Sequence, residues 1–132
     1  MRRTRGSAMN IRLTMAALAA IVVAVPAYAV DNAKVCASTA KDGATPDMII
    51  EACSAIVQDA DNPGVLAGAY YNRGNAYFDK KNYELAIADY DHAVKLRANY
   101  ASAMFNRGLA KKHLGDNAGG DADMAAAKAM NQ

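Results

Sequence analysis

Few side chains in this 132-residue chain have the types and spacing that catalysis or metal binding requires. The only two histidines, His92 and His113, fall on different predicted helices, so they lack the further ligands of a shared metal site. The sequence contains no serine-hydrolase, zinc-protease or nucleotide-binding motif. Met104, Met124 and Met130 are soft metal ligands by type, but methionine at packing positions is ordinarily a core filler. We therefore expect no enzymatic activity, no metal and no cofactor.

The two cysteines, Cys36 and Cys53, are too far apart for a C-x-x-C redox motif or a zinc knuckle. In an oxidising compartment such a pair favours a disulfide, and free buried thiols are the alternative.

The first 29 residues have the pattern of a secretory signal peptide. An uncharged apolar run over 13–25 is followed by Pro26 and by Ala27-Tyr28-Ala29, a small-x-small cleavage site. This run is shorter than the roughly 20 residues that span a bilayer. The basic residues that precede it are Arg2, Arg3, Arg5 and Arg12. The sequence predicts export to the periplasm, cleavage after Ala29 and no stable membrane anchor after processing; a retained anchor helix is the alternative.

Cleavage would also change the charge of the chain. The precursor has 15 Lys and Arg against 13 Asp and Glu, a net charge of +2. Four of the basic residues and none of the acidic ones lie in the leader, so the processed chain becomes slightly acidic. A basic face for nucleic acid is therefore not expected.

The remaining sequence repeats itself at an offset of 34 residues. Asn72-Arg73-Gly74 returns unchanged as Asn106-Arg107-Gly108. A period of this length is typical of a helix-turn-helix repeat. Further identical pairs are Ala67 and Ala101, Ala69 and Ala103, Ala76 and Ala110, Asp89 and Asp123, and Ala93 and Ala127.

The repeated residues resemble the tetratricopeptide repeat (TPR) family from about Leu66 to the C-terminus. Tyr70-x-x-Arg73-Gly74-x-x-Tyr77 follows the family spacing W-x-x-L-G-x-x-Y, and Ala86-x-x-x-Tyr90 follows A-x-x-x-F. The resemblance implies an all-α fold in which antiparallel helix hairpins stack into a short right-handed superhelix. Positions expected to pack the repeats are Tyr70, Gly74, Tyr77, Ala86, Tyr90, Ala93 and Gly108.

We expect three parts: the leader 1–29, a degenerate disulfide-linked hairpin over 30–65, and two TPR-like repeats over 66–132. The repeats are placed at 67–100 and 101–132. Gly119-Gly120 should weaken a helix by about 1 kcal/mol each, so the last helix is expected to begin at Asp121 as its cap. The predicted helices cover 33–40, 47–59, 66–79, 83–96, 101–113 and 121–130.

In TPR-like folds the first helix of each repeat lines the concave side. Here these helices carry aromatic rings and side-chain amides, which suit an extended peptide because an amide can pair with both a backbone N–H and a C=O. The predicted groove residues are Tyr71, Asn72, Asn75, Phe78, Phe105, Asn106, Leu109 and Lys112. A purely architectural role for the asparagines is the alternative.

By resemblance, Asn75 and Asn106 match asparagines that hold a peptide carboxylate in carboxylate-clamp TPR domains. Tyr71 stands where the first lysine of such a clamp would be, so we predict general peptide binding instead.

Arg73 and Arg107 take the family's leucine position and are expected to expose their charged ends. Asp89, Asp91 and Asp123 are expected to be solvated.

The sequence thus predicts a non-catalytic periplasmic protein-interaction module that binds a peptide or protein segment in its concave groove. The alternative is self-assembly, in which the alanine- and methionine-rich last helix packs against another copy to give a homodimer.

Overall fold

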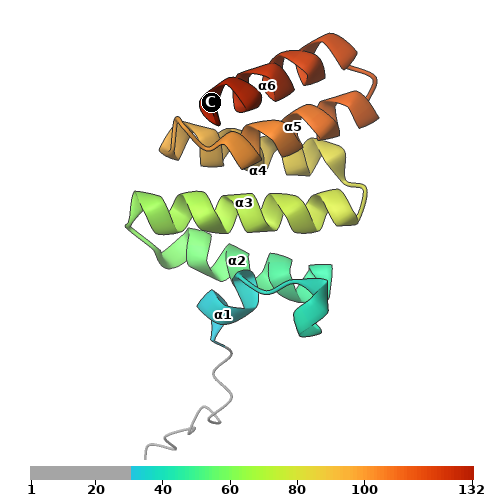
Figure 1. Ribbon diagram of the computed structural model, residues 1–132. Helices are drawn as coiled ribbons and strands as arrows, with labels where there is room; N and C mark the ends of the chain where they lie inside the picture. The colour runs from blue at the N-terminus through green and yellow to red at the C-terminus, as the bar shows by residue number, and fades with distance from the viewer. Residues whose placement is uncertain (1–30) are drawn as a thin grey trace, which may run out of the picture.

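The computed structural model describes residues 31–132, and every regular element in this part of the chain is helical. The helices stack in chain order (Figure 1), which confirms the predicted all-α stack of hairpins. The predicted signal peptide, residues 1–29, lies outside the described residues. The elements are α1 (Asn32–Cys36), the 3₁₀ turn η1 (Ala40–Asp42), α2 (Pro46–Asp59), α3 (Pro63–Asp79), α4 (Tyr83–Leu96), α5 (Ala101–His113) and α6 (Asn117–Met130).

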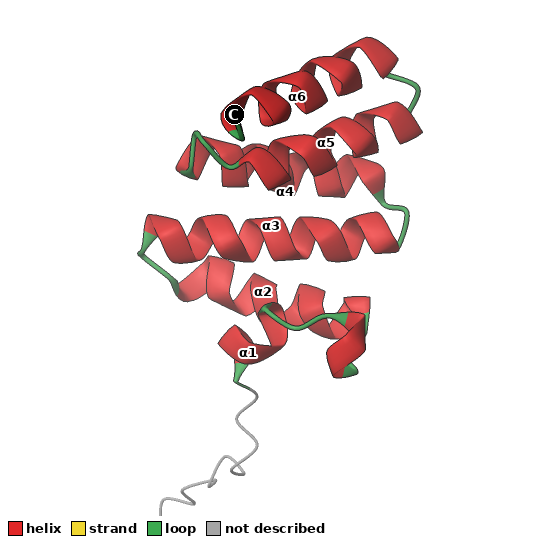
Figure 2. Ribbon diagram, viewed as in Figure 1, coloured by secondary structure: helices red, strands yellow, loops and turns green. Residues whose placement is uncertain are grey.

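Each helix packs against its neighbours in the sequence. The tightest associations are within the hairpins α3–α4 and α5–α6, which are joined by short loops (Figure 2). Helix α2 packs on α3 and α4 packs on α5, so the hairpins form one continuous stack. Within residues 31–132, no helix has the length and apolar character needed to cross a membrane.

The ends of the central helices follow local sequence signals. Helix α3 begins at Pro63, earlier than the predicted Leu66, because Asn62 caps it: Asn62 Oδ1 accepts hydrogen bonds from the backbone N–H groups of Gly64 and Val65 at 2.8 and 3.2 Å. Proline is favoured at this first helical position because it has no N–H to leave unpaired. Helix α4 has the predicted bounds.

The predicted start of the last helix was wrong. Helix α6 begins at Asn117, and its cap is Asp116, whose carboxylate accepts from the N–H of Gly119 at 2.9 Å. A Cβ atom on Gly120 would lie 2.6 Å from the carbonyl oxygen of Gly108. Gly120 is therefore helical because it lets α5 and α6 approach closely, and this packing outweighs the weak helix propensity of glycine.

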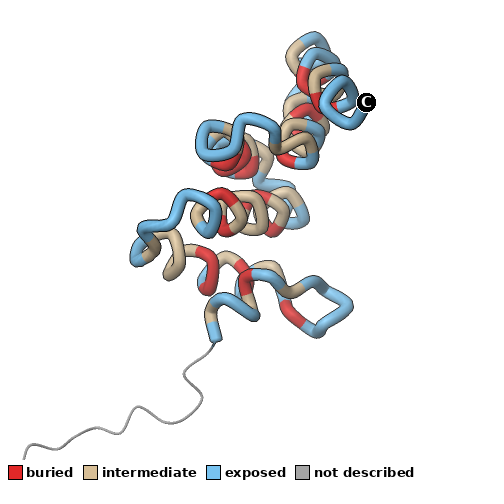
Figure 3. Tube along the Cα trace, turned by 60° about the vertical axis from the view of Figure 1, so that its left-hand side comes forward, coloured by how far each residue is buried: buried red, intermediate tan, exposed pale blue. Residues whose placement is uncertain are grey.

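The core is built mostly from alanine. Buried residues follow the inner faces of the helices along the stack (Figure 3). Ala86, Ala93 and Ala103 are fully buried around Tyr90, which is 1% exposed. Small side chains let the helices lie close together, and the tyrosine fills the space that remains.

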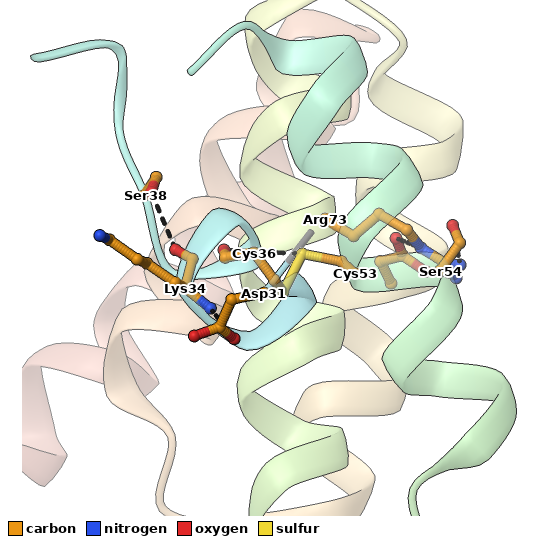
Figure 4. The surroundings of a disulfide bond; sticks show 8 residues. Asp31, Lys34, Cys36, Ser38, Cys53, Ser54 and Arg73 are labelled. Atoms are coloured by element: carbon orange, nitrogen blue, oxygen red, sulfur yellow. Dashed lines mark hydrogen bonds and ion pairs between the residues drawn. A yellow bond between two sulfur atoms is a disulfide. The ribbon is translucent and has the colours of Figure 1, made fainter. Parts of the chain in front are cut away.

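A disulfide joins the N-terminal hairpin. Cys36 in α1 and Cys53 in α2 are bonded with an S–S distance of 2.12 Å, and both are buried (Figure 4). Helix α1 is shorter than the 33–40 predicted, and η1 follows it as a separate turn. A five-residue helix is not stable alone. The bond holds α1 on α2 and, by restricting the unfolded chain, can contribute about 3 kcal/mol.

The glycines give a direct test of this packing. A Cβ atom at Gly74 would lie 2.8 Å from the buried ring of Tyr90, and one at Gly108 would lie 2.7 Å from the carbonyl oxygen of Gly120. We expect Gly74→Ala and Gly108→Ala each to lower the free energy of unfolding by about 1 to 3 kcal/mol in urea denaturation. The control is Gly68→Ala in α3, where a Cβ meets nothing within 4 Å; it should raise that free energy by about 0.5 to 1 kcal/mol. Destabilisation by all three would contradict the close approach.

Candidate functional site

Two arginine–aspartate pairs fix the hairpins that carry the groove. Arg73 on α3 donates from Nε and Nη2 to the two carboxylate oxygens of Asp89 on α4, both at 2.8 Å. Arg107 on α5 makes the same bidentate pair with Asp123 on α6, at 2.7 and 2.6 Å. The pairs are related by the repeat period, so each hairpin is closed in the same way.

The third nitrogen of each arginine reaches the preceding hairpin. Arg73 Nη1 donates to Ser54 Oγ on α2 at 3.0 Å (Figure 4), and Arg107 Nη1 donates to Asp91 Oδ1 on α4 at 2.6 Å. Each guanidinium thus connects three helices: its own, its hairpin partner and the second helix of the hairpin before. This contact orients successive hairpins relative to one another.

The expectation that these charges face solvent was wrong for the two bidentate pairs. Asp89 is 4% exposed and Asp123 is 8% exposed, and the side chains of Arg73 and Arg107 are 18% and 15% exposed. The Asp91 side chain is 45% exposed, as expected. The planar guanidinium matches the two oxygens of a carboxylate, so both charges can leave water together when they are fully hydrogen-bonded.

The ion pair at α6 shifts the ionisation of its carboxylate. Burial raises the pKa of Asp123, but hydrogen bonds from Arg107 and Lys111 outweigh this and hold that pKa below its ordinary 3.8. The Lys111 ammonium lies 2.8 Å from Asp123 Oδ2. The pKa of Arg107 is raised in turn, chiefly by its hydrogen bond to Asp123. The pair therefore stays charged across the neutral range.

A ladder of hydrogen bonds runs along the other face of the same helices. Asn75 Oδ1 on α3 accepts from the Tyr90 hydroxyl at 2.7 Å and from Asn106 Nδ2 on α5 at 2.9 Å. Asn106 Nδ2 also lies 3.4 Å from the hydroxyl of Tyr71. Burial raises the pKa of Tyr90, so its hydroxyl remains a donor at neutral pH. The ladder holds the two asparagines in fixed orientations.

Each of the two asparagines keeps one amide atom outside the ladder. Within residues 31–132, Asn75 Nδ2 and Asn106 Oδ1 have no hydrogen-bond partner, and no buried side-chain nitrogen or oxygen is left unpaired. These two atoms are therefore reached by solvent. Both asparagines line a hollow of about 180 Å³, which we call the concave hollow; its lining is Asn75, Phe78, Asp79, Tyr90, Asn106 and Leu109.

The concave hollow brings together Asn75, Phe78, Asn106 and Leu109 from the predicted groove set. Asp79 also lines the concave hollow and was not among the predicted residues, although it lies one helical turn after Asn75 on the same stripe of α3, a spacing that could have indicated it. Tyr90 was predicted to pack the repeats and lines the hollow as well.

The other predicted groove residues lie elsewhere. The Tyr71 ring contacts those of Tyr90 and Tyr100, with centroids 6.1 and 4.9 Å apart. Asn72 is half-buried on α3 and does not line the concave hollow. Phe105 lines a larger hollow at the end of the stack. Lys112 Nζ is paired with Asp121 on α6 at 2.7 Å, beyond the concave hollow.

Both histidines are engaged in aromatic packing. His113 lies parallel to the ring of Tyr83 with centroids 4.5 Å apart and meets Phe78 edge-on at 5.5 Å. His92 stacks on Tyr70 at 4.7 Å. No group of three potential metal-binding side chains occurs in the part of the chain that the structure describes.

Comparison with known families agrees with this geometry. The family model of the TPR repeat matches residues 74–115, which run from Gly74 in α3 to the end of α5. The TPR resemblance is therefore confirmed for this segment. A comparison with curated proteins gave no match. TPR repeats are typically non-catalytic and bind proteins, so the match indicates a protein-interaction module with protein partners in general.

Because the Arg107–Asp123 ion pair is buried, removing the charge of Asp123 should lower the free energy of unfolding markedly. Asp123→Asn keeps the shape of the side chain but leaves Arg107 with a neutral partner. We expect the free energy of unfolding to fall by about 2 to 3 kcal/mol at pH 7, measured by urea denaturation. Asp121→Asn is the matched control because the Asp121 side chain is 68% exposed; its effect should stay below about 1 kcal/mol.

The same variant should change the acid sensitivity of the fold. The pKa of Asp123 is lower in the folded chain than its ordinary 3.8, so its ionised form stabilises the fold above that pH and this contribution is lost as the pH falls through the lower folded pKa. Between about pH 5 and pH 2, stability should therefore fall less steeply in Asp123→Asn than in the wild type. If the free energy of unfolding fell equally steeply with pH in the wild type and in Asp123→Asn, Asp123 would not be the cause of the acid sensitivity.

Proposed function

We propose that this chain is a non-catalytic periplasmic protein-interaction module that binds an extended peptide segment in the concave groove of α3 and α5. One observation carries the proposal: Asn75 and Asn106 both line the concave hollow, and the ladder between them leaves the Asn75 amide nitrogen and the Asn106 amide oxygen without a partner in the described residues. A peptide backbone offers the complementary acceptor and donor.

The geometry suits a single peptide unit with an apolar side chain. The ligand's C=O accepts from Asn75 Nδ2, and its N–H donates to Asn106 Oδ1. Its side chain enters the concave hollow between Phe78 and Leu109. Because Tyr90 and the ladder already hold both amides in place, binding does not have to order them, and this reduces its entropic cost.

The charges around the concave hollow favour an internal peptide segment over a C-terminal carboxylate. Asp79 lines the hollow, and its negative charge would repel a carboxylate. Lys112, the one cation of the predicted groove set, is paired with Asp121. A ligand with a lysine or arginine beside the apolar residue would place that charge near Asp79.

The periplasmic setting is supported by two independent features. Residues 1–29 have the pattern of a signal peptide. The disulfide between Cys36 and Cys53 is of a kind that persists in oxidising compartments.

The peptide site can be tested with a library of displayed random peptides selected on the purified protein. Selected peptides should bind Leu109→Ala about tenfold more weakly than the wild type, since the variant removes one wall of the concave hollow. Leu85→Ala is the matched control because Leu85 is exposed on α4 outside this hollow. Circular dichroism would verify that both variants are folded. Equal losses in the two variants, or none in Leu109→Ala, would contradict the assignment.

Export can be tested on the protein recovered from the cell envelope. Mass spectrometry should place its N-terminus at Val30, and an alkylating reagent should label neither Cys36 nor Cys53 until a reductant is added. An intact N-terminus with two reactive thiols would exclude the periplasmic setting.

A further inference from the structure

The last hairpin has a second, larger hollow at the end of the stack. It has a volume of about 920 Å³ and lies between the α4–α5 loop, α5 and α6. We call it the terminal seat. Its principal lining residues are Arg97, Tyr100, Phe105, Met124, Ala125 and Lys128.

The terminal seat is the counterpart of the surface that α5 covers one repeat earlier. By the repeat period, Phe105 corresponds to Tyr71 and Met124 corresponds to Tyr90. Tyr71 and Tyr90 belong to the cluster against which α5 places Ala103, which is fully buried. The terminal seat is therefore equivalent to a surface on which a helix packs with small residues.

The lining residues of the terminal seat are more exposed than the equivalent residues one repeat earlier, as expected for a surface on which no helix packs. Tyr90 is 1% exposed, whereas its counterpart Met124 is half-buried and Phe105 is 41% exposed. No helix in residues 31–132 covers this face. An aromatic ring left this open at the rim of an apolar hollow is a feature of interaction sites.

The charges of the terminal seat differ from those of its counterpart. In the earlier repeat, Asp91 on α4 holds Arg107 of the incoming helix. The residue equivalent to Asp91 in α6 is Ala125, which is exposed in the seat. Arg97, which lies over the Tyr100 ring at 4.5 Å, and Lys128 line the seat, and no acidic residue does. A helix with basic residues like those of α5 would therefore meet like charges at the terminal seat.

From this register and these charges we propose that the terminal seat binds an amphipathic α-helix of a protein partner, with small residues on its packing face and Asp or Glu beside them. The ligand is helical and lies at the end of the stack, so this site is separate from the concave hollow, although Asn106 borders both.

Two other occupants fit the charges less well. A second copy bound through the same face would bring its own Arg97 and Lys128 against this seat, and like charges at an interface oppose association. The apolar run over 13–25 follows Arg2, Arg3, Arg5 and Arg12, so its flank has the same unfavourable sign.

The experiment uses a synthetic peptide as a probe of the seat. The peptide has the sequence of residues 99–114, the helix that fills the equivalent position, with Arg107→Glu, Lys111→Glu and Lys112→Glu. The matched control is the peptide with the native residues. In fluorescence anisotropy at low salt with the purified protein, the acidic peptide should bind at least tenfold more tightly than the native one. Failure to bind, or equal affinity of the two peptides, would overturn the proposal.

Three protein variants locate the binding. Ala125→Arg inserts a long side chain at an exposed position of the seat, and Lys128→Glu reverses one of its charges. Each should weaken binding of the acidic peptide at least tenfold in protein that circular dichroism shows to be folded. Leu109→Ala, which alters only the concave hollow, should leave this affinity unchanged while weakening the extended peptides.

The outcomes separate the two sites and the two kinds of partner. If Leu109→Ala abolished binding of the acidic peptide, or if Ala125→Arg and Lys128→Glu both bound it as the wild type does, the helix site at the terminal seat would be overturned. The proposed peptide site in the concave hollow would not be affected by either result.

Light scattering should find that the protein is a monomer. A dimer that Ala125→Arg dissociates would assign the seat to a second copy and overturn the heterologous helix.

Discussion

The bidentate contact between an arginine on one helix and an aspartate on the next determines the geometry of this stack. The core is mostly alanine, and an alanine surface is smooth and has few features that oppose sliding. Arg73 and Arg107 each donate from two guanidinium nitrogens to both oxygens of a carboxylate, which restricts the orientation of the two helices, and the remaining nitrogen bonds to the hairpin before. The ion pairs therefore supply the directional constraint that the small side chains cannot.

This constraint extends to the concave hollow. Asn75 and Asn106 lie on different hairpins, and their hydrogen bond forms only when α3 and α5 keep a fixed separation. Arg107 joins α5 to α4, and Arg73 joins α4 to α3 through Asp89. The same chain of contacts that closes the hairpins thus brings the two amides into register, so the stability of the fold and the proposed peptide site depend on one set of charges.

Much of the fold followed from the sequence because the repeat period identifies which residues occupy equivalent positions in successive hairpins. It gave the bounds of α4 and the end of α5. It did not give the start of α6, where a tertiary contact of Gly120 outweighs local propensity. Arg73 and Asp89 recur unchanged one period later as Arg107 and Asp123, and this joint recurrence of opposite charges could have indicated the ion pairs. The bond from Asn106 to Asn75 depends on the distance between hairpins, which spacing along the chain does not provide.

The two ends of the described helical stack are unequal. Helix α1 has five residues, about one and a half turns, and the bond between Cys36 and Cys53 fastens it to α2. It offers a full-length helix no surface of matching size, whereas α5 and α6 present three to four turns. Within residues 31–132, a further full-length helix therefore has a matching surface at α6 but none at α1, and this asymmetry works against head-to-tail contact between copies, the kind of contact that generates open filaments.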